Sequence, residues 1–421
     1  MADPAAPPRR RPAWKIGGIA VGLLLLLWSA AAVAVHFIAE HRWAAMKADW
    51  QALLEETRKH GSARSPLRGE PLEGNAWPDY LAALAEVRSL YDLESQAAPR
   101  FLKEAPQSSR QMVERVIARH PTLIDSVRRG ARRARANLDL EWKEGALTIP
   151  SRHGSATVAP LAVCLARFLA DAGRRRDAAE LLIDTCRFAG DLDHAEDMAP
   201  GFEALRDLLQ PGLLGREELA QIARELEVLD REFPRRGQRV SLDLLSFGSL
   251  LLKTGHSITG QLVGLQADPD DAAWRYGWSG HLMKAEAFHA IAAAAKELSD
   301  ADERPWQESK EALKKLTAEL SRHRNPIAQT APEEILASDL LHRGHRAQLR
   351  LLRVAAHYGA TGDVLGLDDP FGTKLRVRVS EGTLRAWSVG PEGADHNGTG
   401  AFAFDRDSQD ARDIVLELRL P

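Results

Sequence analysis

The chain has 421 residues, of which 44% are hydrophobic and 27% are charged, so it is long enough to bury a large core and too apolar to be disordered along its whole length. Lysine and arginine total 56 and aspartate and glutamate total 59, which gives a formal net charge of -3. This balance removes the electrostatic argument for binding nucleic acid, and we expect no such partner. Two cysteines are too few for a disulfide-stapled scaffold or a four-cysteine zinc site.

The first predicted element is an apolar segment, residues 16–38, which contains no Asp, Glu, Lys or Arg. As a helix it would extend about 34 Å, enough to cross a hydrocarbon core of roughly 30 Å. Residues 9–11 are arginines and Lys15 follows them, so the positive-inside rule predicts a cytoplasmic N-terminus with the bulk of the chain outside the cytoplasm. We therefore predict a single-pass protein of the cell membrane. The alternative is a cleaved signal peptide with a small-residue site at 32–34.

The sequence predicts a mainly α fold. Residues 1–12 form a disordered cytoplasmic tail, residues 13–60 form the transmembrane helix and a stalk, and residues 72–360 form a helical domain. We interpret this domain as an irregular helical array, with a repeat solenoid as the alternative. The predicted helices after the stalk lie at about residues 77–90, 107–119, 121–137, 157–172, 176–189, 197–210, 215–230, 238–254, 268–298, 305–323 and 332–358.

Residues 161–190 have the pattern of a helical hairpin that turns at Gly173. Apolar and small residues at positions 165, 166, 169, 178 and 182 resemble those of a tetratricopeptide-type hairpin. Cys164 and Cys186 lie at similar heights on its two helices, so we expect them to be neighbours. They form either a disulfide, as an oxidising compartment would allow, or two buried free thiols.

The pattern changes to strands after residue 366, and residues 366–421 are predicted to form a small antiparallel β module. Apolar residues alternate with charged ones at 374–379 and again at 414–420, and a second strand covers 384–389 after a turn at Glu381 and Gly382. The sheet therefore has about three strands.

Four short motifs of this module follow one another in a characteristic order: Asp-Pro-Phe-Gly at 369–372, Leu-Arg-Val-Arg at 375–378, Trp-Ser-Val-Gly-Pro-Glu-Gly at 387–393 and Asp-Ile-Val at 413–415. They resemble the C-terminal sheet of type II secretion major pseudopilins, and also the tail of membrane-anchored bacterial helical proteins. A pseudopilin has an acidic residue in its apolar helix and no large helical insertion, so the resemblance is confined to the terminal module.

The loop at residues 390–413 is rich in glycine and in acidic side chains. Carboxylate and carbonyl oxygens at this density suit calcium, and in the pseudopilins that this segment resembles the corresponding loop holds calcium. The resemblance assigns ligand roles to Asp395 and Asp413, and Asp405 and Asp407 are further candidates. The alternative is a solvated acidic loop.

Two other clusters contain residue types that can bind ligands. Arginines at 128, 129, 132, 133 and 135 are interpreted as a solvated helix face paired with acidic residues, with binding of an anionic headgroup as the alternative. His342 and His345 are interpreted as an exposed face rather than a metal site.

No common catalytic motif is present, so no catalytic residue is predicted. We predict a membrane-anchored extracytoplasmic scaffold that binds an unidentified protein partner and belongs to a secretion or envelope-assembly system. The alternative is an extracytoplasmic enzyme of hydrolase type whose site is assembled from residues distant in sequence.

Overall fold

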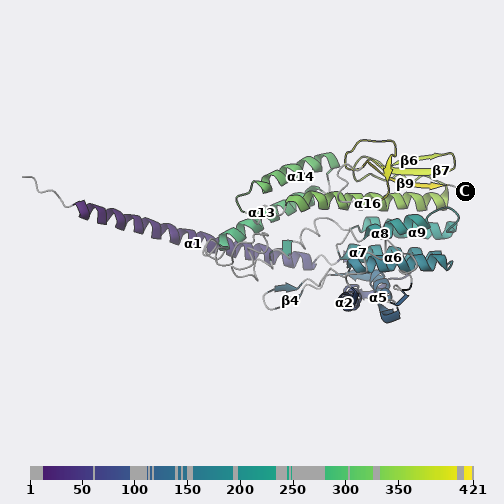
Figure 1. The fold of residues 1–421 in the computed structure, drawn as a ribbon, viewed down its shortest axis with the longest axis horizontal. Coiled ribbons are helices and arrows are strands. Elements are labelled where there is room, and N and C mark those ends of the chain that lie inside the picture. Colours follow the sequence, from purple (N-terminus) through teal and green to yellow (C-terminus); the bar gives the residue numbers. More distant parts are fainter. Residues whose placement is uncertain are drawn as a thin grey trace, which may run out of the picture.

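The fold is mainly helical with a small C-terminal sheet (Figure 1), as the sequence predicts. The short strands between residues 62 and 148 were not predicted. The predicted tail at 1–12 and most of the predicted helices at 107–119 and 238–254 lie outside the described residues. The computed structural model describes residues 13–59, 62–94, 111, 114–115, 118–137, 141–143, 146–148, 155–192, 198–233, 244–245, 248, 280–301, 304–325, 332–404 and 412–419.

Helix α1 (Ala13–Lys59) is a single helix of 47 residues that projects from one end of the molecule (Figure 1). Its apolar half is exposed, since Leu24, Leu26 and Phe37 are 66%, 69% and 71% exposed. Its second half packs against helix α13 (Gly280–Ala301), with Ala39, Trp43, Met46, Trp50 and Leu54 buried at helical spacing. One helix therefore joins an exposed apolar rod to the folded body.

The helices of the body match the predicted ones closely where the structure describes both. They are α2 (Trp77–Glu94), α5 (Pro121–Ala131), α6 (Ser155–Asp171), α7 (Arg175–Asp191), α8 (Ala199–Leu208), α9 (Arg216–Arg231), α13 (Gly280–Ala301), α14 (Trp306–Ser321) and α16 (Pro332–Thr361).

Helices α6 and α7 form the predicted hairpin, and its turn contains Gly173 in a left-handed conformation with φ of 79°. A residue with a Cβ is strained there, which explains why the chain has glycine at this position. The structure gives the hairpin but does not distinguish a tetratricopeptide unit from any other pair of antiparallel helices, so that resemblance stays a prediction.

One predicted helix is wrong in its second half, because residues 121–137 end as a helix at Ala131 and continue as a strand. The strand pairs antiparallel with β1 and parallel with β2, so pairing with segments that follow α1 overrides the helical preference of this stretch. The short strands of this part are β1 (Ser62–Ala63), β2 (Leu72–Asn75), β3 (Arg133–Ala136), β4 (Glu141–Lys143) and β5 (Ala146–Thr148).

The C-terminal sheet has the strand order β6-β7-β9-β8. Glu381 and Gly382 connect β6 and β7 with φ of 50° and 68°, the two positive values that a tight hairpin turn requires. Three antiparallel strands agree with the prediction, whereas the fourth strand, β8, pairs parallel with β9 and was not predicted. The strands are β6 (Arg376–Ser380), β7 (Thr383–Ser388), β8 (Gly400–Ala401) and β9 (Asp413–Arg419).

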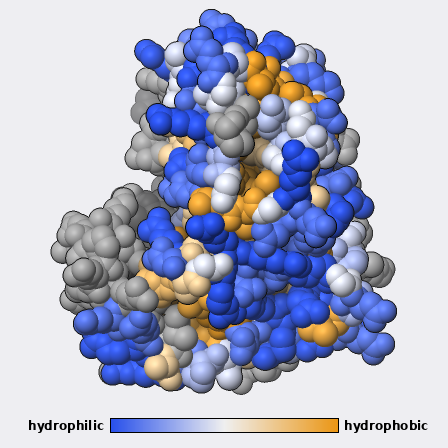
Figure 2. Space-filling model, turned by 90° about the vertical axis from the view of Figure 1, so that its right-hand side faces the viewer, coloured by the Kyte–Doolittle hydropathy of each residue, from blue (hydrophilic) through white to orange (hydrophobic). Residues whose placement is uncertain are grey.

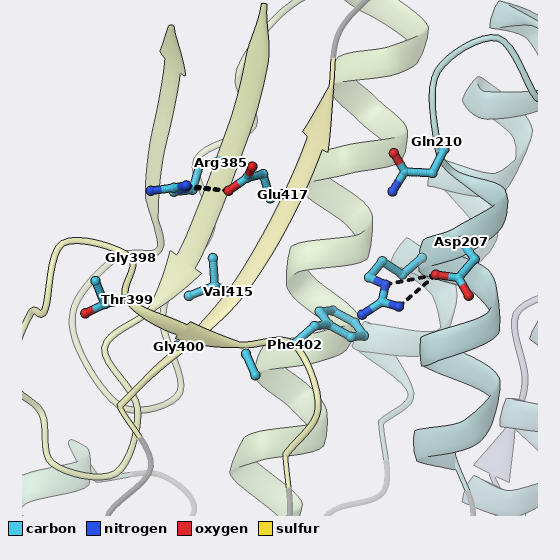
Figure 3. A pocket seen from close by; sticks show the side chains of 11 residues that line it. Asp207, Gln210, Arg385, Gly398, Thr399, Gly400, Phe402, Val415 and Glu417 are labelled. Atoms are coloured by element: carbon cyan, nitrogen blue, oxygen red, sulfur yellow. Dashed lines mark hydrogen bonds and ion pairs between the residues drawn. The ribbon is translucent and has the colours of Figure 1, made fainter. Parts of the chain in front are cut away.

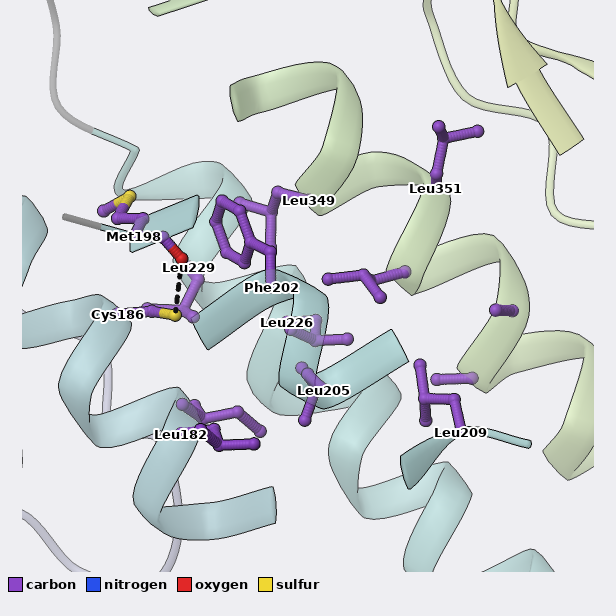
Figure 4. Close-up of a cluster of buried hydrophobic side chains, with 14 of the residues drawn as sticks. Leu182, Cys186, Met198, Phe202, Leu205, Leu209, Leu226, Leu229, Leu349 and Leu351 are labelled. Atoms are coloured by element: carbon purple, nitrogen blue, oxygen red, sulfur yellow. Dashed lines mark hydrogen bonds between the residues drawn. The ribbon is translucent and has the colours of Figure 1, made fainter. Parts of the chain in front are cut away.

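The largest hydrophobic cluster joins the helices to this sheet. Helix α16 packs against α9 on one side and against β7 and β9 on the other. Leu349 and Leu352 of α16 belong to the same cluster as Leu416 of β9. Figure 4 shows part of it, where Phe202 and Leu205 of α8 lie among side chains of α7, α9 and α16. The sheet and helical body therefore share one core, which fixes the sheet at the end of the molecule opposite the exposed half of α1.

Candidate functional site

A groove with a volume of about 560 Å³ lies between helix α8 and the C-terminal sheet. Figure 3 shows its two sides, with Asp207 at the end of α8 and Gln210 just after α8 facing Val415 and Glu417 on β9. Residues 398–402, which lead into and out of β8, close one end. A groove of this volume is within the range of ligand sites, and it opens to solvent along its length.

One side of this groove is the partly covered edge of strand β9. Strand β8 pairs with β9 only at Asp413 and Ile414, whereas β9 continues to Arg419. On that side, residues 415–419 have no strand partner within the described part of the chain. Every second residue of such an edge directs its backbone N–H and C=O away from the sheet. The groove therefore exposes backbone hydrogen-bonding groups.

The short length of β8 has a local cause. A Cβ added to Gly400 would lie 1.7 Å from the carbonyl oxygen of Asp413, so only glycine allows the two strands to approach this closely. After Ala401 the chain turns inward, because Phe402 and Phe404 are buried and the carbonyl of Phe402 accepts a 2.7 Å hydrogen bond from the Gln348 amide. Aromatic burial thus pulls the chain away from β9, and no described strand pairs with the rest of this edge.

The charged side chains of the groove form two pairs. Arg206 donates to Asp207 at 2.7 Å and its guanidinium stacks over the Phe402 ring at 5.4 Å. Arg385 pairs with Glu417 across strands β7 and β9. The carboxylates are the more exposed partners, at 57% for Asp207 and 45% for Glu417, against 34% and 39% for the two arginines.

The sheet is held against the body by the Asp-Pro-Phe-Gly motif that the sequence singled out. The buried carboxylate of Asp369 accepts hydrogen bonds from Phe371 N at 2.9 Å, Ser388 Oγ at 2.6 Å and Val389 N at 2.9 Å. Burial raises the pKa of Asp369, although these three hydrogen bonds act in the opposite direction. Trp306 of α14 adds a 2.8 Å hydrogen bond to the carbonyl of Pro391.

The structure describes two of the four predicted calcium ligands. The Asp395 carboxylate accepts from Trp387 Nε1 at 3.0 Å and from Asn397 N at 2.8 Å, and the first of these hydrogen bonds contributes most to lowering its pKa. Asp413 accepts from the backbone N–H groups of His396 and Gly398 at 3.2 and 2.7 Å. Each carboxylate therefore orders its own part of the loop.

The other two predicted ligands, Asp405 and Asp407, lie outside the described residues. No three His, Cys, Asp or Glu side chains within the described ranges are grouped as metal ligands. The calcium site therefore remains a prediction.

The arginine cluster is not one helix face as predicted, because α5 ends at Ala131 and Arg133 and Arg135 lie on β3. The predicted pairing with acidic residues is found. Arg129 and Arg133 both pair with Asp79 of helix α2, at 3.2 and 2.7 Å. Arg128 donates to the carbonyl of Asp177 at 3.1 Å. These arginines therefore connect α2, α5 and α7.

The interpretation of the histidines is wrong, because His342 and His345 are 6% and 1% exposed. Helix α16 is surrounded by α9, α14 and the sheet, so even its polar positions are covered. The His342 ring packs edge-on against Phe233 with the centroids 5.0 Å apart.

A buried ionic network that sequence reasoning missed joins the segment after α1 to the helical body. Arg68 pairs with Asp184 of α7 at 2.5 Å and with Glu225 of α9 at 3.4 Å. Burial raises the pKa of Asp184 to about 7 and also raises the pKa of Glu225, with Arg68 as the largest opposing influence on both. In the sequence these carboxylates look like ordinary charges of helical segments, so no local signal distinguishes them.

A second network anchors the same segment four residues earlier. Arg64 donates to Asp191 of α7 at 2.6 Å and to the carbonyl of Gly130 at 3.1 Å, and the Tyr80 hydroxyl donates to the same Asp191 carboxylate at 2.5 Å. The side chain of Arg64 is only 3% exposed. The chain that leaves the stalk is thus fixed to the body by buried guanidinium groups.

The two cysteines are free thiols and both are buried. Cys186 lies with Met198 in the largest cluster, 3.9 Å from its carbonyl oxygen (Figure 4), whereas Cys164 belongs to a second cluster with Tyr80 and Phe188. Contrary to the prediction, the two cysteine side chains therefore do not face one another. Burial raises the pKa of both thiols, which keeps them protonated at neutral pH.

Helix α1 is the one described helix that is long and apolar enough to cross a membrane. A signal sequence near an N-terminus has the same length and apolar composition, so both predictions for this segment agree with the structure.

No family model, curated protein or solved structure matches this chain.

Proposed function

We propose that this protein is a membrane-anchored scaffold that holds a protein partner outside the cytoplasm, at the end of its body farthest from the bilayer. The observation that carries the proposal is the continuity of α1. The residues that are exposed and apolar, such as Leu24 and Phe37, and those that pack on α13, such as Trp43 and Trp50, belong to one unbroken helix. Such a helix holds a folded body at a fixed distance from a membrane.

The connection between stalk and body supports the same proposal. Arg42 pairs with Glu286 at 2.9 Å, and Trp50 Nε1 donates to the carbonyl of Leu245 at 3.0 Å. Beyond the stalk, Arg64 and Arg68 fix the next segment to α7. The body is therefore attached to α1 along the stalk and again just after it, as a rigid mount requires.

The groove beside β9 is the proposed partner site. It lies in the part of the molecule that carries the sheet, away from the exposed half of α1 (Figure 1). Figure 2 views this end, where hydrophilic side chains dominate and apolar ones gather in separate patches. Both groove carboxylates are already paired with guanidinium groups, which suits recognition better than acid-base catalysis.

Two features of the sequence support the proposed orientation and cellular role. The arginines at 9–11 and Lys15 support a cytoplasmic N-terminus. The resemblance of residues 369–415 to the pseudopilin sheet supports a role beside a secretion or envelope-assembly system.

Membrane fractionation of cells that express the full chain tests the anchor. We expect the protein to stay with membranes through high salt and alkaline washing, and a reporter fused after Pro421 to be active outside the cytoplasm. A shorter soluble chain that begins near Val35 would overturn the anchor in favour of a signal peptide.

Site-specific photo-cross-linking tests the scaffold. A cross-linking amino acid placed at Gln210, in the groove, should give a defined adduct in membranes, whereas the same group at Lys314, exposed on α14, should not. Equal adducts at both positions would show that the groove is not the partner site.

A further inference from the structure

We infer that the outer face of the C-terminal sheet binds an extended acidic segment of the partner. The inference rests on the proposed function and specifies the chemistry of the partner, because Val415 and Glu417 of this face also line the groove. The basic side chains of the outer face, which together we call the arginine face, are Arg376, Arg378, Arg385 and Arg419.

The register of the sheet places the four arginines on one face. Arg378 lies directly opposite Arg385, and Arg385 lies opposite Glu417, so the side chains of these three residues project to the same side. Arg376 is two residues before Arg378 and Arg419 is two residues after Glu417, which keeps both on that side. The opposite face packs on the body, and its buried residues are Leu384, Ala386, Leu416 and Leu418.

Two of these arginines have carboxylate partners within the protein. Arg385 pairs with Glu417 on the neighbouring strand, and Arg376 lies 3.6 Å from Asp395 in the loop after β7. Their side chains are 39% and 48% exposed, respectively. Because a guanidinium has five N–H donors, each of these arginines can bind a second carboxylate that approaches from solvent.

The other two arginines, Arg378 and Arg419, are exposed and are in no ion pair within the described part of the chain. Glu381, in the turn between β6 and β7, pairs with neither of them. The Arg378 guanidinium lies over the Trp387 ring at 5.7 Å, and Arg378 is directly opposite Arg385. Like charges opposite one another destabilise a sheet, and a carboxylate bound between the two guanidinium groups relieves that repulsion.

The positions of these arginines match a segment with an acidic residue at every second position. Neighbouring strands are about 4.8 Å apart and the rise per residue is about 3.4 Å, so the Cα atoms of Arg378 and Arg419 are separated by roughly 12 Å. Residues i and i+4 of an extended chain are about 13 Å apart, and residue i+2 lies between them. A segment that crosses the strands at an angle therefore brings its middle carboxylate near Arg385.

The place of the sheet in the molecule separates the arginine face from other anionic surfaces. In Figure 1 the sheet lies beyond the docked half of α1, residues 39–59, which alone extends about 30 Å. Headgroups of the membrane that holds α1 therefore do not reach this face. The proposed orientation also keeps it apart from cytoplasmic nucleic acid. Acidic proteins and acidic polysaccharides remain, and the scaffold proposal selects a protein.

Peptide binding to the full-length protein in neutral detergent tests the inference by fluorescence anisotropy at 0.15 M salt. The labelled seven-residue probes are serine alternating with three glutamates, serine alternating with three lysines, and a serine peptide whose three glutamates are consecutive. We expect the alternating glutamate peptide to bind at least tenfold more tightly than the lysine peptide and at least threefold more tightly than the consecutive one. Equal affinities in either comparison would overturn the inference.

Matched protein variants locate the site. Arg378→Gln combined with Arg419→Gln should weaken binding of the alternating glutamate peptide at least tenfold. Arg174→Gln combined with Arg176→Gln removes the same charge at exposed positions beside the turn between α6 and α7, and should leave the affinity unchanged. Equal losses in the two double variants would show an effect of net charge alone and overturn the inference.

A lysine variant separates loss of binding from loss of folding. Arg378→Lys combined with Arg419→Lys keeps both charges, so it should bind the alternating glutamate peptide within threefold of the unchanged protein. Melting followed by circular dichroism shows whether each variant is folded. A folded lysine variant that binds as weakly as the glutamine variant would contradict recognition by charge.

Competition identifies the class of the occupant. Polygalacturonate, an acidic polysaccharide, should displace the labelled glutamate peptide only at a carboxylate concentration at least tenfold above that of the unlabelled peptide. Displacement at a lower concentration than the peptide requires would identify a polysaccharide partner and overturn the inference. Self-association of the protein that the glutamate peptide abolishes would identify a second copy of the chain and overturn it as well.

The outcomes separate this inference from the proposed function. If the peptides fail while the cross-linker at Gln210 still gives its defined adduct, the scaffold stands and the acidic segment is wrong. If the chain leaves the membrane on alkaline washing, the anchor fails, and peptide binding by the purified protein is unaffected by that result.

Discussion

Arg68 and Asp184 form a 2.5 Å ion pair inside the protein, between the segment that follows α1 and helix α7. Glu225 lies on the other side of the same guanidinium, at 3.4 Å from Nε, and is 0% exposed. One arginine thus compensates two buried carboxylates, and the segment after the stalk cannot leave the body without separating these charges.

Replacing Arg68 should therefore destabilise the protein strongly. At about pH 8, above the raised pKa of Asp184, Arg68→Met leaves both carboxylates buried without their guanidinium, and the loss of one partner of a buried pair costs about 3–5 kcal/mol. Denaturant titration followed by circular dichroism measures it. Arg176→Met removes an exposed pair with Glu180 and should change the free energy of unfolding by less than about 0.5 kcal/mol. Similar losses in the two variants would contradict the role of Arg68.

The raised pKa of Asp184 predicts how stability depends on pH. The folded protein holds a proton on this carboxyl up to about pH 7, whereas the ordinary pKa is 3.8. The contribution of this group is fully present below pH 3.8 and is lost as the pH rises through 7.

Asp184→Asn should remove that dependence, which reaches about 1.4 kcal/mol per pH unit for one proton. Unfolding free energies of both proteins between pH 4.5 and 8 give the comparison. Parallel curves would show that Asp184 is not the group that titrates.

Two glycines of α16 should respond oppositely to alanine. A Cβ on Gly344 would lie 2.2 Å from the buried ring of Phe404, so Gly344→Ala displaces the ring and should cost about 1–3 kcal/mol. A Cβ on Gly359 meets only the end of the Leu219 side chain, at 2.8 Å, which can move. Gly359→Ala should then be stabilising by up to about 1 kcal/mol through helix propensity. Melting temperatures measure both, and a stable Gly344→Ala protein would contradict the packing of Phe404.

Removing Trp50 should release the stalk from the body. Its ring is 2% exposed and its Nε1 donates to Leu245, so Trp50→Ala should weaken docking of α1 by about 3–5 kcal/mol. Limited proteolysis of membranes measures the effect as faster cleavage within residues 39–59. Trp28→Ala, in the exposed apolar half, should leave the cleavage rate unchanged. Equal rates in both variants would mean that Trp50 does not hold the stalk.

Helices were predictable from sequence because their signals are local. Helix α14 was expected at 305–323 and forms at Trp306–Ser321, and α16 begins at the predicted proline and ends beside Gly362. The C-terminal hairpin was predictable for the same reason, since alternating residues and the turn at Glu381 and Gly382 are contiguous.

The groove and the buried networks were not predictable, because each depends on which distant segments meet. Arg206 and Glu417 line one groove although they are 211 positions apart in the printed sequence. Strand β8 has two residues and no alternation to detect. His342 looks like a solvated position of a charged helix, and only the packing of other elements on every side of α16 buries it.

Because α1 is one unbroken helix of 47 residues, a tilt of its apolar half also tilts the body that is attached to its other half. The helix is about 70 Å long and has neither proline nor a described kink between its apolar half and its docked half. In the proposed arrangement, a thinner bilayer tilts the apolar half to bury its full length, and the body must swing with it. A tilt of 20° moves a point 70 Å along this lever sideways by about 24 Å, so lipid thickness sets both the direction and the height at which the groove is presented.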